Sequence, residues 1–412
     1  MSLTNPNDVL AAVGLKPEEG KVWLESWPLS EKSFVPENLF FLKDDYVSEA
    51  CRTLKMDDEA RRAFLEALPA FKNSQALQRL AWHCHYLLFQ RRDAQHTEKI
   101  SSWPMLPGVG MFYAFIFLSG LNHARNIHQK LGIPEAITLD TLSDLQLWIY
   151  EYRKKNGIWG FAEKGWLAHH FLGKLFKLGR LQFLPGNFAH DFHVFRHSTG
   201  KHLILAGENM CFRRDGQFDG ADKTSDAEGK WTAGFEVKDD HISGHPVSPH
   251  GKALPERIKL PASEWLEILK KKSPALTIHI PATGPLLHSD CGASLQQAVE
   301  FFPRYFPEYG FNALTCESWL LDGQFESHIS PSSNIVRFLR EFYLYPLPNA
   351  DDKQTFERVF GRNIEDIKNA PQDTSLQRAV VKHVSNGGRW RMGGGMLFPD
   401  GMKWGGQVYR NE

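Results

Sequence analysis

His279 lies in an apolar segment where a histidine is unexpected. The stretch from Leu276 to Phe302 reads LTIHIPATGPLLHSDCGASLQQAVEFF, and its first residues have the pattern of a buried strand. Imidazole changes its charge near neutral pH, so a histidine here is a candidate general base, for example for the proton of an attacking amine. The alternative is a core histidine that is hydrogen bonded to a neighbouring carbonyl.

The residues that follow this strand predict an anion site. Two prolines and a glycine interrupt the strand, and a helix is expected to start at a cap formed by Ser289 or Asp290 and to end at Pro303. The first amides of a helix have no partner within it and lie at the positive end of its dipole. Gly284 and Gly292 leave room for a ligand beside the backbone. The alternative is that Ser289 only caps its own helix.

A group of histidines offers a different chemistry. In AHDFHVFRH, the side chains of His190, His193 and His197 would converge on a metal ion if the segment were helical. The preceding Pro185 and Gly186 and the turn STGK favour a strand, on which His193 and His197 share one face and His190 points to the other. We interpret all three as exposed strand histidines. A metal-dependent hydrolase built on the His-rich residues 190–250 is the alternative.

Other common catalytic motifs are not found in the sequence. His83 and His85 in WHCH are about 200° apart on a helix and cannot share one ion. There is no GxSxG elbow, no Walker loop and no GxGxxG after a strand. Cys316 lies in an apolar strand, where a free cysteine usually packs. The glycines at 393–395 are interpreted as a flexible turn.

Composition narrows the class of protein and its partners. Lysine plus arginine total 48, as do aspartate plus glutamate, so no net charge indicates nucleic acid or a membrane surface as partner. The five cysteines form no CxxC pair, which predicts neither structural zinc nor a disulfide framework. The N-terminus lacks a secretory pattern, and the longest apolar run, 111–121, is too short to cross a bilayer. We expect a cytoplasmic protein without a metal.

The hydrophobic pattern changes near residue 175. Before it the periodicity is helical, as in DDEARRAFLEALPAF, with Asp57 or Asp58 as cap. After it come strands, including a hairpin that turns at 198–201, and a short helix is predicted for PASEWLEILKKK. From residue 275 strands and helices alternate. The predicted fold class is therefore α+β, with a helical domain at 1–172, a mixed sheet flanked by helices at 173–348 and a helical extension with a Gly-rich tail at 349–412.

Several longer segments occur together in an order that resembles a known family. They include TLSDLQLW from Thr141, LFKLGRLQF, ISGHPVSPHGKAL, IHIPATGPL, SLQQAVEFFPRYFPE, CESWLLDGQF, SNIVRFLREF and DTSLQRAVVKHVSNGGRW, which ends at Trp390. The chain resembles a bacterial family of acyltransferases whose members join a helical N-acyltransferase N-terminal domain to a GNAT-like C-terminal domain.

The resemblance implies transfer of an acyl group from acyl-CoA, as co-substrate, to an amine on a small molecule or peptide. It implies that acyl-CoA enters a wedge between ALTIHIP and FNALTCESWLL, with its pyrophosphate on the loop and helix that follow ALTIHIP. The loop departs from the family pattern [QR]xxGx[GA], since it keeps only Gly292 and carries Asp290. A GNAT-like module that binds a ligand or partner without turnover is therefore a second hypothesis. The residues expected to bind the coenzyme are Ile280, Gly284, Ser289, Gly292 and Ser294.

Acyl transfer also needs groups that move protons. His279 is the candidate base, Glu317 on the opposing strand is a second candidate, and Ser318 could donate to the leaving thiolate. Arg180 and Gln182 are polar residues within a strand. We expect their side chains either to line a substrate pocket or to pair with acidic neighbours. The residues expected to bind the acceptor substrate are Arg180, Gln182, Trp319 and Asn334.

Overall fold

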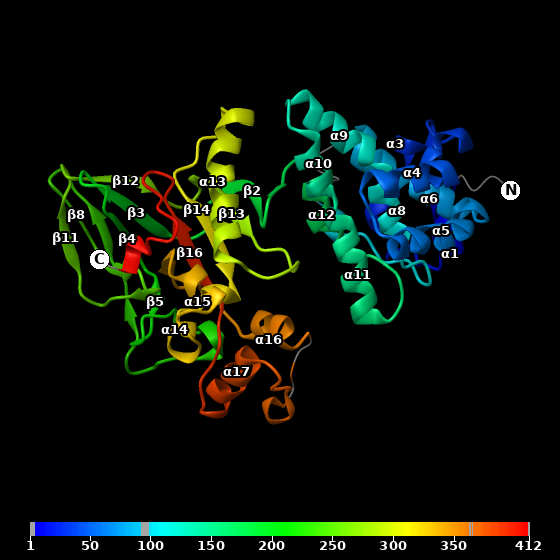
Figure 1. The fold of residues 1–412 in the computed structure, drawn as a ribbon. Coiled ribbons are helices and arrows are strands. Elements are labelled where there is room, and N and C mark those ends of the chain that lie inside the picture. Colours follow the sequence, from blue (N-terminus) through cyan, green and yellow to red (C-terminus); the bar gives the residue numbers. More distant parts are fainter. Residues whose placement is uncertain (1–4, 92–98, 362–363, 365, 411–412) are drawn as a thin grey trace. The chain divides into compact units, whose positions relative to one another are not determined.

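The computed structural model describes residues 5–91, 99–361, 364 and 366–410. The chain divides into two compact units, Met1–Leu178 and Gly179–Glu412 (Figure 1). The division lies close to the boundary at 172 and 173 that the sequence suggested. No helix in the described ranges is long and apolar enough to cross a membrane.

The first unit is helical, as the periodicity predicted. Asp57 caps helix α5, and its carboxylate accepts a hydrogen bond of 2.8 Å from the amide of Ala60. All eight residues of α8 are buried, so the long apolar run forms part of the core. The α-helices of this unit are α1 (Pro6–Ala12), α2 (Lys21–Leu24), α3 (Trp27–Glu31), α4 (Asp44–Thr53), α5 (Asp58–Lys72), α6 (Gln75–His85), α8 (Phe112–Ser119), α9 (Leu121–Lys130), α10 (Glu135–Leu142), α11 (Asp144–Asn156) and α12 (Lys164–Phe171).

The two histidines of WHCH are part of this helical core. The Nδ1 atom of His83 lies 2.7 Å from the hydroxyl of Ser30, and the Nδ1 atom of His85 lies 2.7 Å from the hydroxyl of Ser119. Hydrogen bonds of this kind stabilise buried polar side chains. Both histidines are thus part of the packing of α6 against its neighbours.

A mixed sheet forms the centre of the second unit. Its strands lie in the order β2 (Leu181–Asn187), β13 (Pro274–His279), β14 (Leu314–Ser318), β16 (Gly393–Leu397) and β15 (Tyr343–Tyr345). Strands β13 and β14 are parallel, whereas β2 with β13, β14 with β16 and β15 with β16 are antiparallel. This arrangement confirms the predicted α+β class.

Helix α13 (His288–Tyr305) packs against this sheet through Leu295, Ala298 and Phe302. Two details of the prediction were wrong. The N-cap position is Leu287, not Ser289 or Asp290, and the helix continues through Pro303 to Tyr305. A helix whose N-cap has no polar side chain leaves its first amides without an intrahelical or capping partner.

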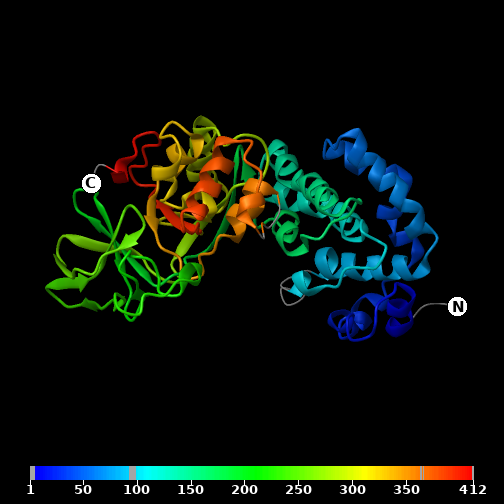
Figure 2. The same cartoon turned by 90° about the horizontal axis from the view of Figure 1, so that it is seen from below.

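A second group of strands forms a layer of three smaller sheets, green in Figure 2. The predicted hairpin is present as β3 and β4, which pair antiparallel. The predicted helix PASEWLEILKKK was wrong, because Trp265–Leu269 forms strand β12 beside β3 and the carboxylate of Glu267 binds His193. Pairing with an existing edge outweighed helix propensity here. The strands of this layer are β3 (Phe192–His197), β4 (His202–Ala206), β5 (Cys211–Phe212), β6 (Trp231–Thr232), β7 (Phe235–Val237), β8 (His241–Gly244), β9 (Pro246–Ser248), β10 (Lys252–Ala253), β11 (Ile258–Pro261) and β12.

Short helices connect the later strands. Helix α15 lies between β14 and β15, as the alternation predicted, whereas α16 and α17 lie between β15 and a strand, β16, that was not predicted. These helices are α14 (Phe325–His328), α15 (Asn334–Leu339), α16 (Lys353–Phe360) and α17 (Ser375–Ser385), with 3₁₀ turns at Trp319–Leu321 (η6) and Val408–Arg410 (η8).

The glycines at 393–395 are not a flexible turn, and this interpretation was wrong. They begin β16, which lies between β14 and β15 and is fully buried. A Cβ atom on Gly394 would overlap the ring of Tyr345, and one on Gly393 would overlap the carbonyl oxygen of Leu321. Glycine is needed here because neighbouring groups lie directly on the strand. The segment 349–412 is therefore not an extension, since it supplies a central strand of the sheet.

Candidate functional site

Strands β13 and β14 separate after a short paired segment. In the described structure they are paired only at Leu276 with Leu314 and at Thr277 with Thr315, although β13 continues to His279 and β14 to Ser318. The backbone beyond Thr277 and Thr315 is thus not joined across this gap by ladder hydrogen bonds. An opening between two parallel strands can bind an extended ligand along its exposed amides and carbonyls.

A histidine and a glutamate meet at the open end of these strands. The Nε2 atom of His190 lies 2.7 Å from a carboxylate oxygen of Glu317 on β14. The side chain of His190 is 15% exposed and that of Glu317 is 43% exposed, so solvent and a substrate can reach the pair. Glu317 was predicted as a catalytic candidate, but His190 was interpreted as an exposed strand histidine. The segment AHDFH drew attention to His190, but its partner Glu317 lies 127 residues away, so the sequence alone did not pair them.

Tyr345 is the third polar group at this position. Its ring centroid lies 5.6 Å from that of His190, and its hydroxyl is buried with no hydrogen-bond partner among the described residues. Burial raises the pKa of Tyr345 well above its ordinary value, and the nearby Glu317 and Cys316 raise it further. The phenol therefore keeps its proton in the neutral range and can donate a hydrogen bond.

The other predicted catalytic residues have different surroundings. His279 is the last residue of β13 and is paired in register with Gln182 of β2, on the side away from β14. Ser318 is buried, and its hydroxyl accepts a bond of 3.2 Å from the amide of Leu320 at the start of η6. Burial raises the pKa of the Cys316 thiol, in agreement with a packing role.

Arg180 holds the loop between β13 and α13. Its guanidinium donates to the carbonyl oxygens of Pro285 at 3.0 Å, Pro281 at 3.1 Å and Gly284 at 3.5 Å. The sequence predicted that Arg180 lines a pocket or pairs with an acidic residue, and neither alternative included a contact with these carbonyl oxygens. The loop that contains Ile280 and the exposed Gly284 is thus fixed by a cation.

The predicted contacts of α13 divide into two groups. Ser289 is exposed on the first turn, where its hydroxyl bonds to the carboxylate of Asp290 at 3.1 Å. Gly292 does not leave room for a ligand, because the indole of Trp404 occupies the space that a Cβ atom would fill. The hydroxyl of Ser294 is buried and accepts from the amides of Arg180 at 2.7 Å and Leu181 at 3.3 Å. Ser294 therefore connects α13 to β2.

Comparisons with known families cover both units. A family model described as a GNAT-like C-terminal domain matches residues 175–397, and one described as an N-acyltransferase N-terminal domain matches residues 45–173. This protein belongs to the family with the GNAT-like C-terminal domain. The predicted family, α+β fold and acyltransferase class are thereby confirmed.

Solved structures share the fold of this GNAT-like protein over nearly the whole chain. One is an acyltransferase in complex with decanoyl-CoA and teicoplanin, 23% identical, with a TM-score of 0.64 over 96% of this chain and 99% of that chain. Another is an acyltransferase mutant in complex with octanoyl-CoA, 22% identical, with a TM-score of 0.63 over 97% and 99%. The comparison with curated proteins gave no match.

Two predicted acceptor residues of the GNAT-like domain lie apart from the acid–base groups. The amide of Trp319 donates to the side chain of Gln354 at 3.0 Å, and the indole packs against Phe325. Asn334 is the first residue of α15. Within the described ranges, neither side chain forms a ring contact or hydrogen bond with His190 or Glu317.

Several histidines of the GNAT-like domain are paired with carboxylates. His193 lies 2.6 Å from Glu267, and His241 lies 2.6 Å from Asp240. Within the described parts of the chain, no group of three or more histidine, cysteine, aspartate or glutamate side chains is arranged to hold a metal. The family and these pairings both favour acyl transfer over the metal-dependent hydrolase.

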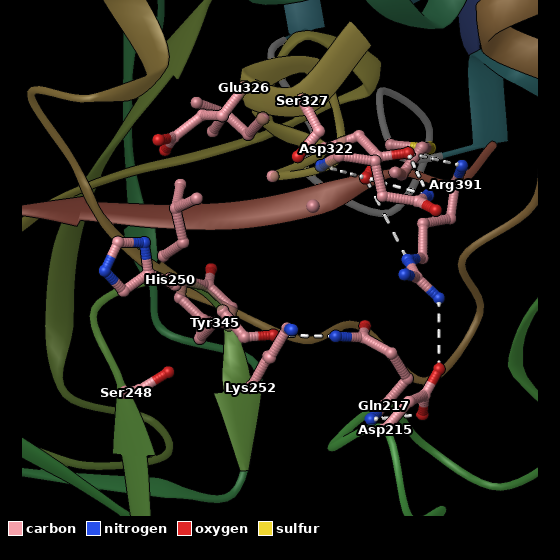
Figure 3. Close-up of a pocket in the computed structure, with 17 residues that line it drawn as sticks. Asp215, Gln217, Ser248, His250, Lys252, Asp322, Glu326, Ser327, Tyr345 and Arg391 are labelled. Carbon is pink, nitrogen blue, oxygen red and sulfur yellow. Dashed lines mark hydrogen bonds and ion pairs between the residues drawn. The ribbon is translucent and has the colours of Figure 1, made fainter. Parts of the chain in front are cut away.

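A cavity of about 470 Å³ lies beside Tyr345 in the GNAT-like domain (Figure 3). Its walls come from five segments distant in sequence: residues 215–217, 248–252, 321–327 after β14, 344–345 of β15, and 391–393 at the start of β16. Arg391 fixes one wall, since its guanidinium lies 3.2 Å from Asp222 and 3.6 Å from Asp215 while its amide donates to Asp322 at 3.0 Å. The cavity is thus preformed.

Proposed function

We propose that the protein transfers an acyl group from acyl-CoA to a primary amine on a small molecule. The observation that carries this proposal is the His190–Glu317 pair at the mouth of the opening between β13 and β14. Two solved structures of the same fold contain decanoyl-CoA and octanoyl-CoA, and one of them also contains teicoplanin as a small-molecule ligand. These ligands support an acyl-CoA as co-substrate and a small-molecule acceptor.

The coenzyme would bind along β13 and at the start of α13. The backbone of Ile278–Ile280 is not paired with β14 and can bond to the amide groups of the pantetheine arm. The pyrophosphate would lie at the first turn of α13, which has no side-chain cap and whose amides carry the positive end of the helix dipole. Arg180, which holds this loop, adds a positive charge that the altered glycine motif lacks.

His190 would take the proton from the attacking amine. With Nε2 bonded to Glu317, the free Nδ1 atom can accept a proton, and the carboxylate stabilises the imidazolium that forms. The amine nitrogen then bonds to the thioester carbonyl carbon, and the tetrahedral intermediate collapses with cleavage of the C–S bond. The pair in this scheme replaces His279, the last residue of β13, which is paired in register with Gln182 of β2.

Tyr345 would protonate the leaving thiolate. Its hydroxyl is buried, keeps its proton through neutral pH and lies on the same side of the sheet as Glu317. The proton held by His190 then returns to the phenolate, which restores both groups. Coenzyme A and the amide product leave with the atoms in balance.

The test is release of a free CoA thiol that depends on an added amine. Purified protein is mixed with decanoyl-CoA and a panel of primary amines, and thiol is followed with a chromogenic disulfide. We expect thiol release above the hydrolysis background, together with stabilisation in thermal shift by octanoyl-CoA and decanoyl-CoA. Stabilisation by acyl-CoA without any amine-dependent thiol would support the hypothesis of a GNAT-like binding module. Thermal stabilisation by zinc and none by acyl-CoA would contradict both the proposed acyl transfer and the hypothesis of a binding module.

A further inference from the structure

The cavity beside Tyr345 is connected to the proposed acid–base groups through that residue. Tyr345 lines the cavity and also packs its ring against His190. A ligand in the cavity would therefore lie beside a residue that contacts the proposed general base.

The walls of the cavity are mainly polar. Asp215 has a side chain that is 49% exposed, and Glu326 contributes a second carboxylate that is 18% exposed. Ser248, His250 and Ser327 add neutral groups that donate or accept hydrogen bonds (Figure 3). Carboxylates and hydroxyls of this kind bind ammonium and hydroxyl groups, and they do not solvate an acyl chain.

The arginines near the cavity are paired with carboxylates. Arg391 and Arg213 face Asp222 and Asp215, so the half-exposed Asp215 is held at a fixed position. Arg340 and Arg410 both lie 3.2 Å from Glu326. Lys252 is exposed at the edge and provides the remaining cation of the wall. Because these pairs position the carboxylates before a ligand arrives, binding needs little rearrangement.

We propose that this cavity binds the acceptor substrate and that the acceptor is a hydrophilic primary amine. The inference rests on the proposed acyl transfer and names the substrate class for it. The ammonium group is attracted to Asp215, and hydroxyl or amide groups of the ligand bond to Ser248, His250 and Ser327. The volume is in the range of pockets that enclose a small polar molecule. A plain alkylamine is a poor match for these walls.

Ser327→Trp tests the cavity because it fills space without changing a charge. The matched control is Ser198→Trp, in the exposed turn between β3 and β4. With L-serine amide as acceptor and decanoyl-CoA as donor, we expect KM for the amine to rise at least tenfold in Ser327→Trp and to stay unchanged in the control. The Kd of decanoyl-CoA should be the same in all three proteins. Hexylamine should show a higher KM than L-serine amide in the unmodified protein.

A binding measurement separates failure of the cavity from failure of the reaction. Saturation-transfer NMR with L-serine amide requires no turnover. Loss of the amine signal in Ser327→Trp but not in Ser198→Trp supports the cavity even if no acyl transfer is detected. An amine signal or KM that is equal in both variants overturns the proposal, as does the absence of any amine signal in the unmodified protein.

Discussion

Glu317 of β14 and Tyr345 of β15 are both paired in register with Gly394 of β16, so their side chains lie on one face of the sheet with only a glycine between them. Side chains of directly paired residues point to the same face of a sheet. The carboxylate accordingly raises the pKa of the buried phenol, after burial itself. The two groups that the proposed reaction uses at its beginning and end therefore share one electrostatic environment.

Replacement of His190 by glutamine should remove the general base. We expect kcat to fall about a hundredfold or more, in the range that loss of general base catalysis produces. The Kd of decanoyl-CoA should not change, since the proposed coenzyme contacts are on β13 and α13 and do not include His190. The matched control is His193→Gln, which breaks another histidine–glutamate pair of similar length, on β3 and β12. Equal activity of both variants would contradict the assignment.

Tyr345→Phe removes one oxygen atom. The hydroxyl is buried and has no partner in the described ranges, so its loss should leave the free energy of unfolding unchanged or slightly higher. The rate of acyl transfer should nevertheless fall about tenfold or more if the phenol protonates the thiolate. Denaturant unfolding and steady-state kinetics measure the two quantities. A variant that is as active as the parent removes Tyr345 from the mechanism.

Gly394→Ala should destabilise the protein. The added Cβ atom would overlap the ring of Tyr345, and the cost of overpacking a core is typically about 1–3 kcal/mol. Gly186→Ala in β2 is the matched control, because no atom lies within 4 Å of the position of its Cβ. The midpoint of thermal unfolding should drop clearly for the first variant and little for the second. Similar midpoints would contradict this, because they would mean that the ring of Tyr345 moves aside without loss of stability.

Ser294→Ala should lower stability without affecting the coenzyme. The hydroxyl accepts from two buried amides, and leaving them without a partner costs about 2 kcal/mol. The sequence had assigned Ser294 to coenzyme binding, which predicts the opposite result. Urea unfolding and titration with decanoyl-CoA distinguish the two roles. A weaker coenzyme affinity at unchanged stability would restore the original assignment.

The buried imidazole of His202 should make stability depend on pH. Burial first and the nearby Arg196 second lower its pKa to about 4, whereas an unfolded histidine has a value near 6.5. Because the folded pKa is the lower one, the contribution is fully present above about pH 6.5 and is lost as the pH falls towards 4. His202→Phe keeps the stacking on Phe398 and should flatten this part of the profile. Urea midpoints measured from pH 7 to pH 4.5 test this, and an unchanged slope would contradict it.

The alternation of strands and helices after residue 275 was predictable because each segment carries its own periodicity. Buried positions of α13 and β13 recur at spacings of about 3.6 and 2. The hairpin of β3 and β4 was also found, because its turn residues are local. These features depend on neighbours within a few residues.

The parts that could not be predicted depend on contacts between distant segments. Trp265–Leu269 forms a strand because β3 offers an edge to pair with. Gly393–Gly395 can form a strand inside the sheet because glycine has no Cβ atom to overlap the ring of Tyr345 or the carbonyl oxygen of Leu321. The partner of His190 lies on a strand that forms far along the chain. Arg180 was recognised as polar, but its carbonyl partners follow from the path of a loop that begins at Pro281.

The position of β16 sets an order of events during synthesis. This strand lies between β14 and β15, yet it is made last of the three, after α16 and α17 have been translated. Before Leu397 leaves the ribosome, β14 and β15 each expose an unpaired edge, which is a template for aggregation. Completion of the sheet therefore has to wait until almost the whole chain has been translated. Chains that stop before Gly393 should be recognised by chaperones as unfinished proteins.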